Sequence, residues 1–285
     1  MPSLSISARD LLASGVHYGH KVSRWNPKMR PYIHARKSLI HIIDVRETIK
    51  GLVKAWHFVK NLAARGELIL FVGTKRQAGG VVQNEAARAG MPYVSERWLG
   101  GTLTNYETIR TRLGRLKEIE QWEKDGTIHR YSKKEQSSIQ REKRKLLRNL
   151  DGLRAMERLP ACLLVVDPVH EKIAVTEGHK IGAAAVALID SDGDPDEVDI
   201  AIPGNDDSIK VVQIIVSKLA DAVLEGRANP VGVPKAEEIS RAGAVSISVP
   251  EKQGAINIGK GGRPRRASTP GRSGAGGGAP RPPGP

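Results

Sequence analysis

The segment LILFVGTKRQAGG, residues 68–80, decides the fold class of this 285-residue chain. It opens with a short apolar run, which predicts a buried strand at residues 67–72. Gly73 ends that run, and residues 77–89 then carry the apolar spacing of a helix. A buried strand that passes through a tight turn into a helix is the unit from which parallel α/β sheets are built.

The same alternation continues on both sides of this segment. Asp44 and Glu47 predict the start of a helix over residues 45–64, and a final helix is expected to begin at Asn205 or Asp206, with Ile209 among its inward-facing residues. Further strands are expected at 38–43, 93–94, 162–166, 185–189 and 199–202, with another helix at 169–181. We therefore predict one α/β domain, made of residues 1–104 and 157–250, with a parallel sheet flanked by helices on both faces.

Residues 105–156 interrupt the alternation. Ile109, Leu113 and Leu116 recur at heptad-like spacing, and Ile139, Leu146, Leu150 and Leu153 repeat the pattern after a polar break at 124–132. This predicts an inserted antiparallel coiled-coil hairpin that projects from the domain and stays outside its core. A solvent-exposed, salt-bridged helix pair without nucleic-acid contacts is the alternative.

Charge is distributed unevenly along the chain. The net charge is +14, residues 1–104 carry +10 and residues 157–250 carry −8. Such polarity favours a protein that contacts nucleic acid with one side and proteins, ions or solvent with the other. Residues 251–285 contain 16 Gly or Pro, so we expect a disordered basic tail there.

Composition also excludes several classes of protein. The one cysteine, Cys162, allows neither an intrachain disulfide nor a cysteine-built metal centre, and its position within an apolar run predicts an inert thiol. Neither a secretory signal nor a run of about 18 apolar residues is present. We therefore expect a cytoplasmic protein with no membrane contact.

The segment from Gly15 to Asp44 is the strongest candidate for an RNA contact. Its cations are interleaved with Tyr18, Trp25 and Tyr32, and no acidic residue precedes Asp44. Cations neutralise phosphates, and flat side chains stack on unpaired bases. A solvated basic loop anchored by its aromatic residues is the alternative. Further candidate contacts are cations of the strand-end turn, of a later loop and of the hairpin. The full set is Lys21, Arg24, Trp25, Lys28, Arg30, Arg36, Lys37, Lys75, Arg76, Arg97, Arg110 and Arg112.

A nucleotide-using enzyme of the cytosol is the competing hypothesis, because phosphates bind where strands pass into helices. The turn after Gly73 lacks both glycine fingerprints of such enzymes, since the next glycine is Gly79. Lys75 and Arg76 suit a single backbone phosphate instead. No grouping of a nucleophile with a base is apparent, so we expect no catalysis, no cofactor and no small-molecule substrate.

Metal sites are not expected either. The acidic loop at 190–199 imitates the start of a calcium loop, but Pro195 and Ala201 stand where that loop needs glycine and a bidentate carboxylate. A solvated loop or a weak magnesium contact is the better interpretation. His17 and His20 have no metal-binding partners nearby in the sequence, so we expect them to satisfy local hydrogen bonds.

Five segments taken together resemble one family. GVHYGHKVSRWNPKMRPYI, HIID, ILFVGTKRQA, RWLGGTLTN (97–105) and IPGNDD (202–207) occur in the order and spacing of the bacterial-type ribosomal protein S2 family, over roughly residues 5–227. The resemblance implies a flavodoxin-like domain with a protruding hairpin and a structural, non-enzymatic role. It further implies binding to small-subunit rRNA near the junction of head and body, contacts with neighbouring ribosomal proteins, and help in docking the mRNA-binding protein S1. A free regulatory RNA-binding protein remains a third hypothesis.

Overall fold

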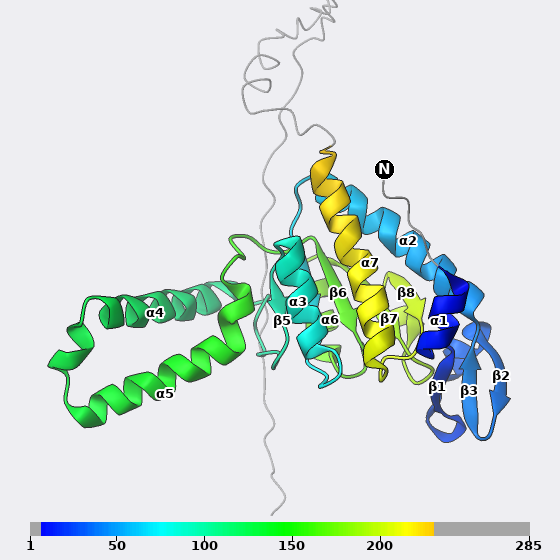
Figure 1. Cartoon of the computed structure of the whole chain (residues 1–285), viewed down its shortest axis with the longest axis horizontal. Helices are drawn as coiled ribbons and strands as arrows, with labels where there is room; N and C mark the ends of the chain where they lie inside the picture. Colours follow the sequence, from blue (N-terminus) through cyan, green and yellow to red (C-terminus); the bar gives the residue numbers. More distant parts are fainter. Residues whose placement is uncertain (1–6, 231–285) are drawn as a thin grey trace, which may run out of the picture. The chain divides into compact units, whose positions relative to one another are not determined.

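A computed structural model describes residues 7–230, and a parallel sheet of five strands forms its centre (Figure 1). The strands lie in the order β5-β4-β6-β7-β8. This is the 2-1-3-4-5 order of flavodoxin-like folds, so the predicted fold class is confirmed. The strand bounds are β4 (Ile69–Val72), β5 (Tyr93–Val94), β6 (Cys162–Val166), β7 (Ala184–Ile189) and β8 (Ile200–Pro203).

Both faces of this sheet are covered, as the unbroken apolar runs require. Alternate residues of each strand point to opposite faces; Phe71 belongs to one hydrophobic cluster, while Leu70 and Val72 belong to the other. The first face packs against α2 (Val45–Ala64), α3 (Gly79–Ala89) and α7 (Ile209–Ala228), and the second against α6 (Lys172–Lys180) and the base of the hairpin.

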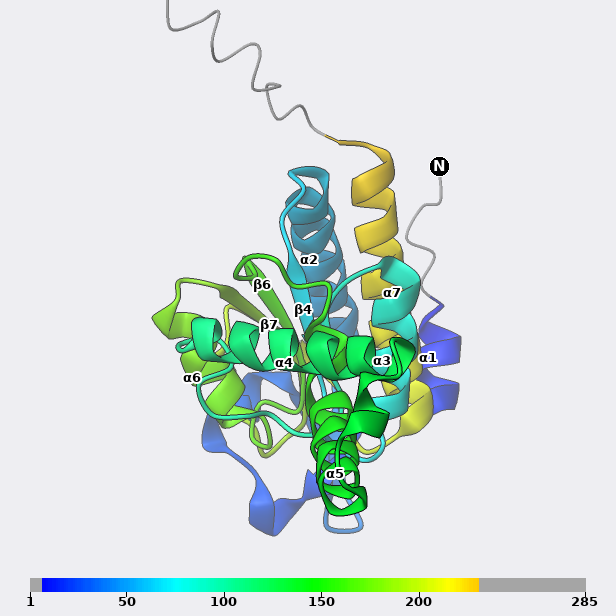
Figure 2. The ribbon, with the colours of Figure 1, turned by 90° about the vertical axis from the view of Figure 1, so that its left-hand side faces the viewer.

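Helices α2 and α7 lie side by side in both views (Figures 1 and 2). Their close approach depends on Gly226, where a Cβ atom would stand 2.3 Å from the carbonyl oxygen of Lys60. The predicted bounds of α2 are correct, and the Asp44 carboxylate accepts a hydrogen bond from the Arg46 amide at its start. Helix α7 begins later than expected, at Ile209 after the N-cap Ser208, and Ile209 is 59% exposed instead of facing inward.

The N-terminal part contains elements that the sequence did not predict. Helix α1 (Ala8–Ser14) precedes an antiparallel sheet of β1 (Tyr18–Lys21), β2 (Ile33–Lys37) and β3 (Ile40–Ile43), in the order β1-β3-β2. The expected strand at 38–43 is shorter, because Ser38 and Leu39 form a turn with φ values of 50° and 63°. Two short 3-10 helices, η1 (Val22–Arg24) and η2 (Pro27–Tyr32), connect β1 to β2.

The inserted hairpin consists of α4 (Tyr106–Lys124), η3 (Thr127–Arg130) and α5 (Lys133–Leu150), followed by η4 (Asp151–Leu153) (Figures 1 and 2). Ser132 and Glu135 form a capping box at the start of α5. The base of the hairpin differs from the expectation, because Leu150 and Leu153 are buried in the cluster on the second face of the sheet. The hairpin is thus rooted in the core through its base.

Helix α6 also begins later than expected, at Lys172 instead of residue 169. Asp167 has a φ of 63°, and its carboxylate accepts hydrogen bonds from the amides of Val169 and His170, so the chain turns there before the helix begins. Another short helix, η5 (Pro195–Glu197), lies in the acidic loop. Within residues 7–230, no helix has the length and apolar character needed to cross a membrane. The basic tail predicted at 251–285 lies outside the described residues.

Candidate nucleic-acid interface

Two lysines of the antiparallel sheet lie on one face of it. Lys21 of β1 and Lys37 of β2 are both in register with Ile40 of the central strand, from opposite sides. Residues in register point to the same face, so the two lysine side chains leave the sheet on the same side. Their Cα atoms lie about two strand spacings, roughly 10 Å, apart. Both side chains are exposed. Arg36 pairs in register with His41 and therefore points to the other face.

Arg24 in η1 and Arg30 in η2 are exposed beside these strands. We call these five cations (Lys21, Arg24, Arg30, Arg36 and Lys37) the basic sheet. Across residues 7–230, none of the five has an acidic partner within salt-bridge distance. The basic sheet therefore offers unneutralised positive charge to an anion.

Lys28, predicted as part of the same contact, has a different environment. Its ammonium group lies 2.8 Å from Asp194 and 2.8 Å from Asp196 of the acidic loop. These hydrogen bonds raise the pKa of Lys28 above its usual value. The lysine is half exposed, but its charge is already balanced by the protein.

The aromatic residues of the segment are mostly committed to packing. Trp25 stacks on His41 with ring centroids 5.1 Å apart, and Tyr32 packs against the core of the second sheet face. Tyr18 is 50% exposed and lies beside His17. Of the three aromatic residues named from the sequence, Tyr18 has the ring most open to a base.

Lys75 points into the protein, whereas the sequence predicted that Lys75 and Arg76 would both face a phosphate at the strand end. Its ammonium group lies 3.3 Å from Asp167, 2.6 Å from Asp206 and 2.7 Å from Asp207. The carboxyl ends of β4, β6 and β8 meet at one edge of the parallel sheet, which explains how residues distant in sequence converge. Burial alone would lower the pKa of Lys75, but the hydrogen bonds to Asp206 and Asp207 raise it. Arg76, the next residue, remains exposed.

His20 joins the same edge of the sheet, although nothing in the sequence around it indicates this. Its Nδ1 atom lies 2.8 Å from Asp190, which is 2% exposed. The hydrogen bond with Asp190 raises the pKa of His20 to about 9, although burial lowers it. His20, Asp190 and Asp206 offer ligand atoms within 4.8 Å of one another, a nitrogen and oxygen set of the kind that zinc accepts. The expectation of purely local hydrogen bonds for His20 is therefore wrong, because its partners come from 170 residues away.

The acidic loop at 190–199 is not simply a solvated face. The Ser191 hydroxyl accepts a hydrogen bond from the amide of His20, and the Ser191 carbonyl accepts one from the amide of Asn26. Asp199 accepts a hydrogen bond from the amide of Ala185. The loop thus attaches the N-terminal basic segment to the parallel sheet, and part of its charge is used inside the protein.

The RWLGGTLTN segment is organised around one carboxylate. Glu177 of α6 accepts hydrogen bonds from Trp98 Nε1 and from the amides of Gly101 and Leu103, at 3.2, 2.7 and 2.9 Å. Burial would raise the pKa of Glu177, but these hydrogen bonds hold it below the usual value. Most of this segment is therefore structural, and Arg97 is the part of it that remains exposed.

Arg110 and Arg112 are exposed on α4, and no acidic side chain of the described part of the chain pairs with either of them. Figure 1 places the hairpin and the antiparallel sheet on opposite sides of the five-stranded sheet. The predicted contacts therefore do not form a single patch. The basic sheet and the hairpin cations are separate groups, and Arg76 and Arg97 are exposed in the loops that follow β4 and β5.

Comparison with known proteins agrees with the resemblance seen in the motifs. The family model described as ribosomal protein S2 matches residues 11–226. The small ribosomal subunit protein uS2 of Rhodopirellula baltica is 55% identical over 219 residues, which are 77% of this chain and 84% of that protein. The matched region contains both the basic sheet and the hairpin.

Proposed function

The chain belongs to the ribosomal protein S2 family, and from this premise we propose that its basic sheet binds rRNA phosphates in the small ribosomal subunit. Membership makes it a small-subunit ribosomal protein that serves translation. The proposal concerns how the protein is held there. A second contact, through Arg110 and Arg112 of the hairpin, would bind RNA on the other side of the parallel sheet, and Arg76 and Arg97 would add contacts from the loops after β4 and β5.

The observation that carries the proposal is the difference between paired and unpaired cations. Lys28 and Lys75 are balanced by carboxylates, whereas the five cations of the basic sheet are exposed and have no acidic partner in the described chain. An exposed cation without a partner gains most from a phosphate, because it releases condensed counterions and breaks no ion pair. Two lysines on one face of a rigid sheet also lose little entropy on binding.

A nucleotide-using enzyme fits the geometry poorly. In flavodoxin-like sheets, ligands bind beyond the carboxyl ends of the strands at the switch point, here between β4 and β6. Asp167, Asp206 and Asp207 gather at that edge around Lys75. These carboxylates already balance the charge of Lys75, so the lysine has no unpaired charge to offer to a nucleotide phosphate.

The proposal includes the finer roles implied by the resemblance, which are a position near the junction of head and body and help in docking protein S1. Docking of a protein needs exposed apolar surface. Leu12 of α1 is 48% exposed and Ile209 at the start of α7 is 59% exposed. Ile209, together with Ala13 and Ile214, lines a groove between these two helices, which offers such a contact.

Binding of the full chain to small-subunit rRNA at several salt concentrations tests the main proposal. The slope of log K against log salt changes by about 0.7 to 0.9 for each phosphate contact. A variant with Lys21→Ala, Arg36→Ala and Lys37→Ala should therefore bind more weakly, with a slope shallower by about two to three units.

A control variant with Arg46→Ala, Lys50→Ala and Lys172→Ala loses the same charge at cations that pair with Asp44, Glu47 and Glu197. It should change the slope by less than about one unit. Equal effects of the two triple changes would show that net charge, and not the basic sheet, determines the affinity.

A further inference from the structure

The turn that joins β2 to β3 exposes an apolar side chain. Lys37 and Ile40 are in register, so the turn consists of Ser38 and Leu39 alone. Leu39 is 79% exposed, more than any other large apolar residue of the described chain. Single exposed leucines are common on proteins, so this exposure by itself indicates no function.

The backbone of the turn disfavours a leucine. Both residues have a positive φ, 50° at Ser38 and 63° at Leu39, as in a type I′ turn. Asparagine followed by glycine suits such a turn best, because asparagine tolerates a positive φ and glycine has no Cβ atom. The chain therefore keeps a bulky apolar residue where a smaller one would be more stable. Strain of this kind is frequent at sites that bind a ligand.

The turn is held in place from the side. The carbonyl oxygen of Leu39 accepts a hydrogen bond from the amide of Val22 at 2.9 Å, which ties the turn to the residue after β1. Strand β3 leads from the turn to Asp44, the N-cap of α2, so the turn lies at the end of β3 away from that helix. The backbone beneath Leu39 therefore loses little freedom when the side chain makes a contact.

Lysines flank Leu39 on both sides. Lys37 precedes the turn, and Lys21 is in register with Ile40, the residue that follows it. Both lysines are exposed, and neither pairs with a carboxylate of residues 7–230. A ligand of the turn must therefore suit one apolar side chain between two positive charges. A nucleotide does so, because its base has an apolar face and its phosphate is negative.

We propose that Leu39 packs against the face of an unpaired rRNA base, while Lys21 and Lys37 bind phosphates on either side of that nucleotide. The inference rests on the proposed function and adds an uncharged contact to it. The base is an unpaired one, because bases within a helix are stacked on their neighbours and hide their faces.

A neighbouring protein is the other class of occupant, and it fits the turn less well. A specific protein contact buries about 800 Å² on each partner around an apolar centre. Here the apolar part is one leucine, and Lys21, Arg36 and Lys37 around it would each need a carboxylate from the partner. RNA supplies the matching negative charge along its backbone.

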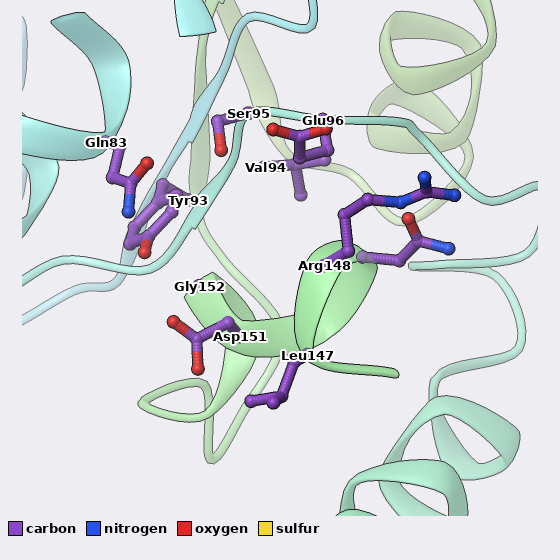
Figure 3. A pocket seen from close by; sticks show the side chains of 10 residues that line it. Gln83, Tyr93, Val94, Ser95, Glu96, Leu147, Arg148, Asp151 and Gly152 are labelled. Carbon is purple, nitrogen blue, oxygen red and sulfur yellow. The ribbon is translucent and has the colours of Figure 1, made fainter. Parts of the chain in front are cut away.

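The polar cavity at the base of the hairpin suits RNA less well than the turn does (Figure 3). Arg148 lines this cavity, but so do Glu96 and Asp151. Asp151 pairs with Arg154 at 2.8 Å, whereas Glu96 forms no salt bridge within the part of the chain that the structure describes. An unpaired carboxylate repels a phosphate, and the turn has none beside Leu39 within its own four residues.

The test compares Leu39→Asn and Leu39→Gly with Leu159→Asn in the full chain. Asparagine and glycine fit the turn but remove the apolar contact, and Leu159 is a 42% exposed leucine of the segment before β6. Both Leu39 variants should bind small-subunit rRNA about tenfold more weakly, which corresponds to roughly 1.4 kcal/mol. Their slope of log K against log salt should be unchanged, because no charge is lost. Leu159→Asn should bind like the unchanged protein.

Stability and a conservative variant separate this contact from a folding defect. The thermal midpoint of Leu39→Asn and Leu39→Gly should be unchanged or higher by up to about 4 °C, because both residues tolerate a positive φ. Leu39→Met keeps an apolar side chain of similar volume, so it should retain most of the affinity. Equal losses of affinity in the Met and Asn variants would contradict an apolar contact.

A benzophenone amino acid at position 39 identifies the occupant in purified small subunits. It should crosslink to a nucleotide in a single-stranded segment of rRNA. A crosslink to a protein or to a paired nucleotide would overturn the inference, and so would normal rRNA affinity in both Leu39→Asn and Leu39→Gly. The proposed function would still stand in those cases if the change of Lys21, Arg36 and Lys37 weakened binding with a shallower salt slope. Normal affinity in that variant would count against the proposed function itself.

Discussion

Replacing Glu177 by glutamine tests whether one carboxylate organises the loop that carries Arg97 and leads into the hairpin. One carboxylate oxygen accepts from Trp98 Nε1 and the Gly101 amide, and the other accepts from the amides of Leu103 and Thr104. Glutamine keeps one of these oxygens. Its NH₂ group stands where the other was, so it points a donor at two N–H groups.

The expected cost follows from this count. Two hydrogen bonds to a charged group are lost, each worth about 1.5 to 3 kcal/mol, and the two that remain are weakened by loss of the charge. Some relaxation of the loop recovers part of the energy. We therefore expect Glu177→Gln to lower the free energy of unfolding by about 3 to 5 kcal/mol, as when a buried charged group loses its partners.

Urea unfolding followed by circular dichroism measures this difference. Glu118→Gln is the matched control, because Glu118 is 60% exposed and pairs with Arg115 on the surface of α4. A surface pair of this kind contributes at most about 1 kcal/mol. A loss in Glu177→Gln no larger than in the control would refute the idea that Glu177 holds the loop.

Four further predictions concern the pH dependence, the acidic loop, the hairpin and the switch point. The pKa of Glu177 is lowered in the folded protein, so its contribution to stability is complete above its unfolded pKa of about 4.3 and disappears as the pH falls through the folded value. Between pH 6 and pH 3, an interval of about three pH units, the unfolding free energy of Glu177→Gln should therefore fall less steeply than that of the unchanged protein. Parallel curves for the two proteins would contradict this. Changing Asp194 and Asp196 to Asn frees Lys28 and should strengthen rRNA binding in a filter assay; weaker binding by the folded variant would contradict it. A short Gly/Ser linker in place of residues 117–145 should preserve a cooperative thermal transition, whereas removal of 105–156 should abolish it, because it deletes Leu150 and Leu153 from the core. Calorimetry with ATP, GTP and NAD should detect no specific binding, and stoichiometric binding weakened by Lys75→Ala would revive the enzyme hypothesis.

The parallel sheet could be predicted because each of its strands is recognisable from its own short run of residues. Residues 162–166 are apolar without interruption, as a strand buried on both faces must be, and they form β6. The antiparallel sheet could not be predicted in the same way. Strand β2 reads IHARK and is exposed at four of five positions, so it has no alternation of apolar and polar residues to reveal it.

The candidate contacts could be named from charge, but their pairing could not. Lys75 and its partner Asp206 are 131 residues apart, and their proximity depends on the order of the strands. The same holds for His20 with Asp190. A cation with a partner and a cation without one look identical in sequence, so the sequence predicts the same role for Lys28 and Lys37.

A cryo-electron microscopy structure of the small ribosomal subunit that contains this chain would test the central claim most directly. We expect rRNA phosphate oxygens within about 4 Å of the ammonium groups of Lys21 and Lys37, the distance of an ion pair. The claim would be contradicted if the nearest phosphates lay beyond the Debye length of roughly 8 to 10 Å, with the basic sheet facing solvent or another protein.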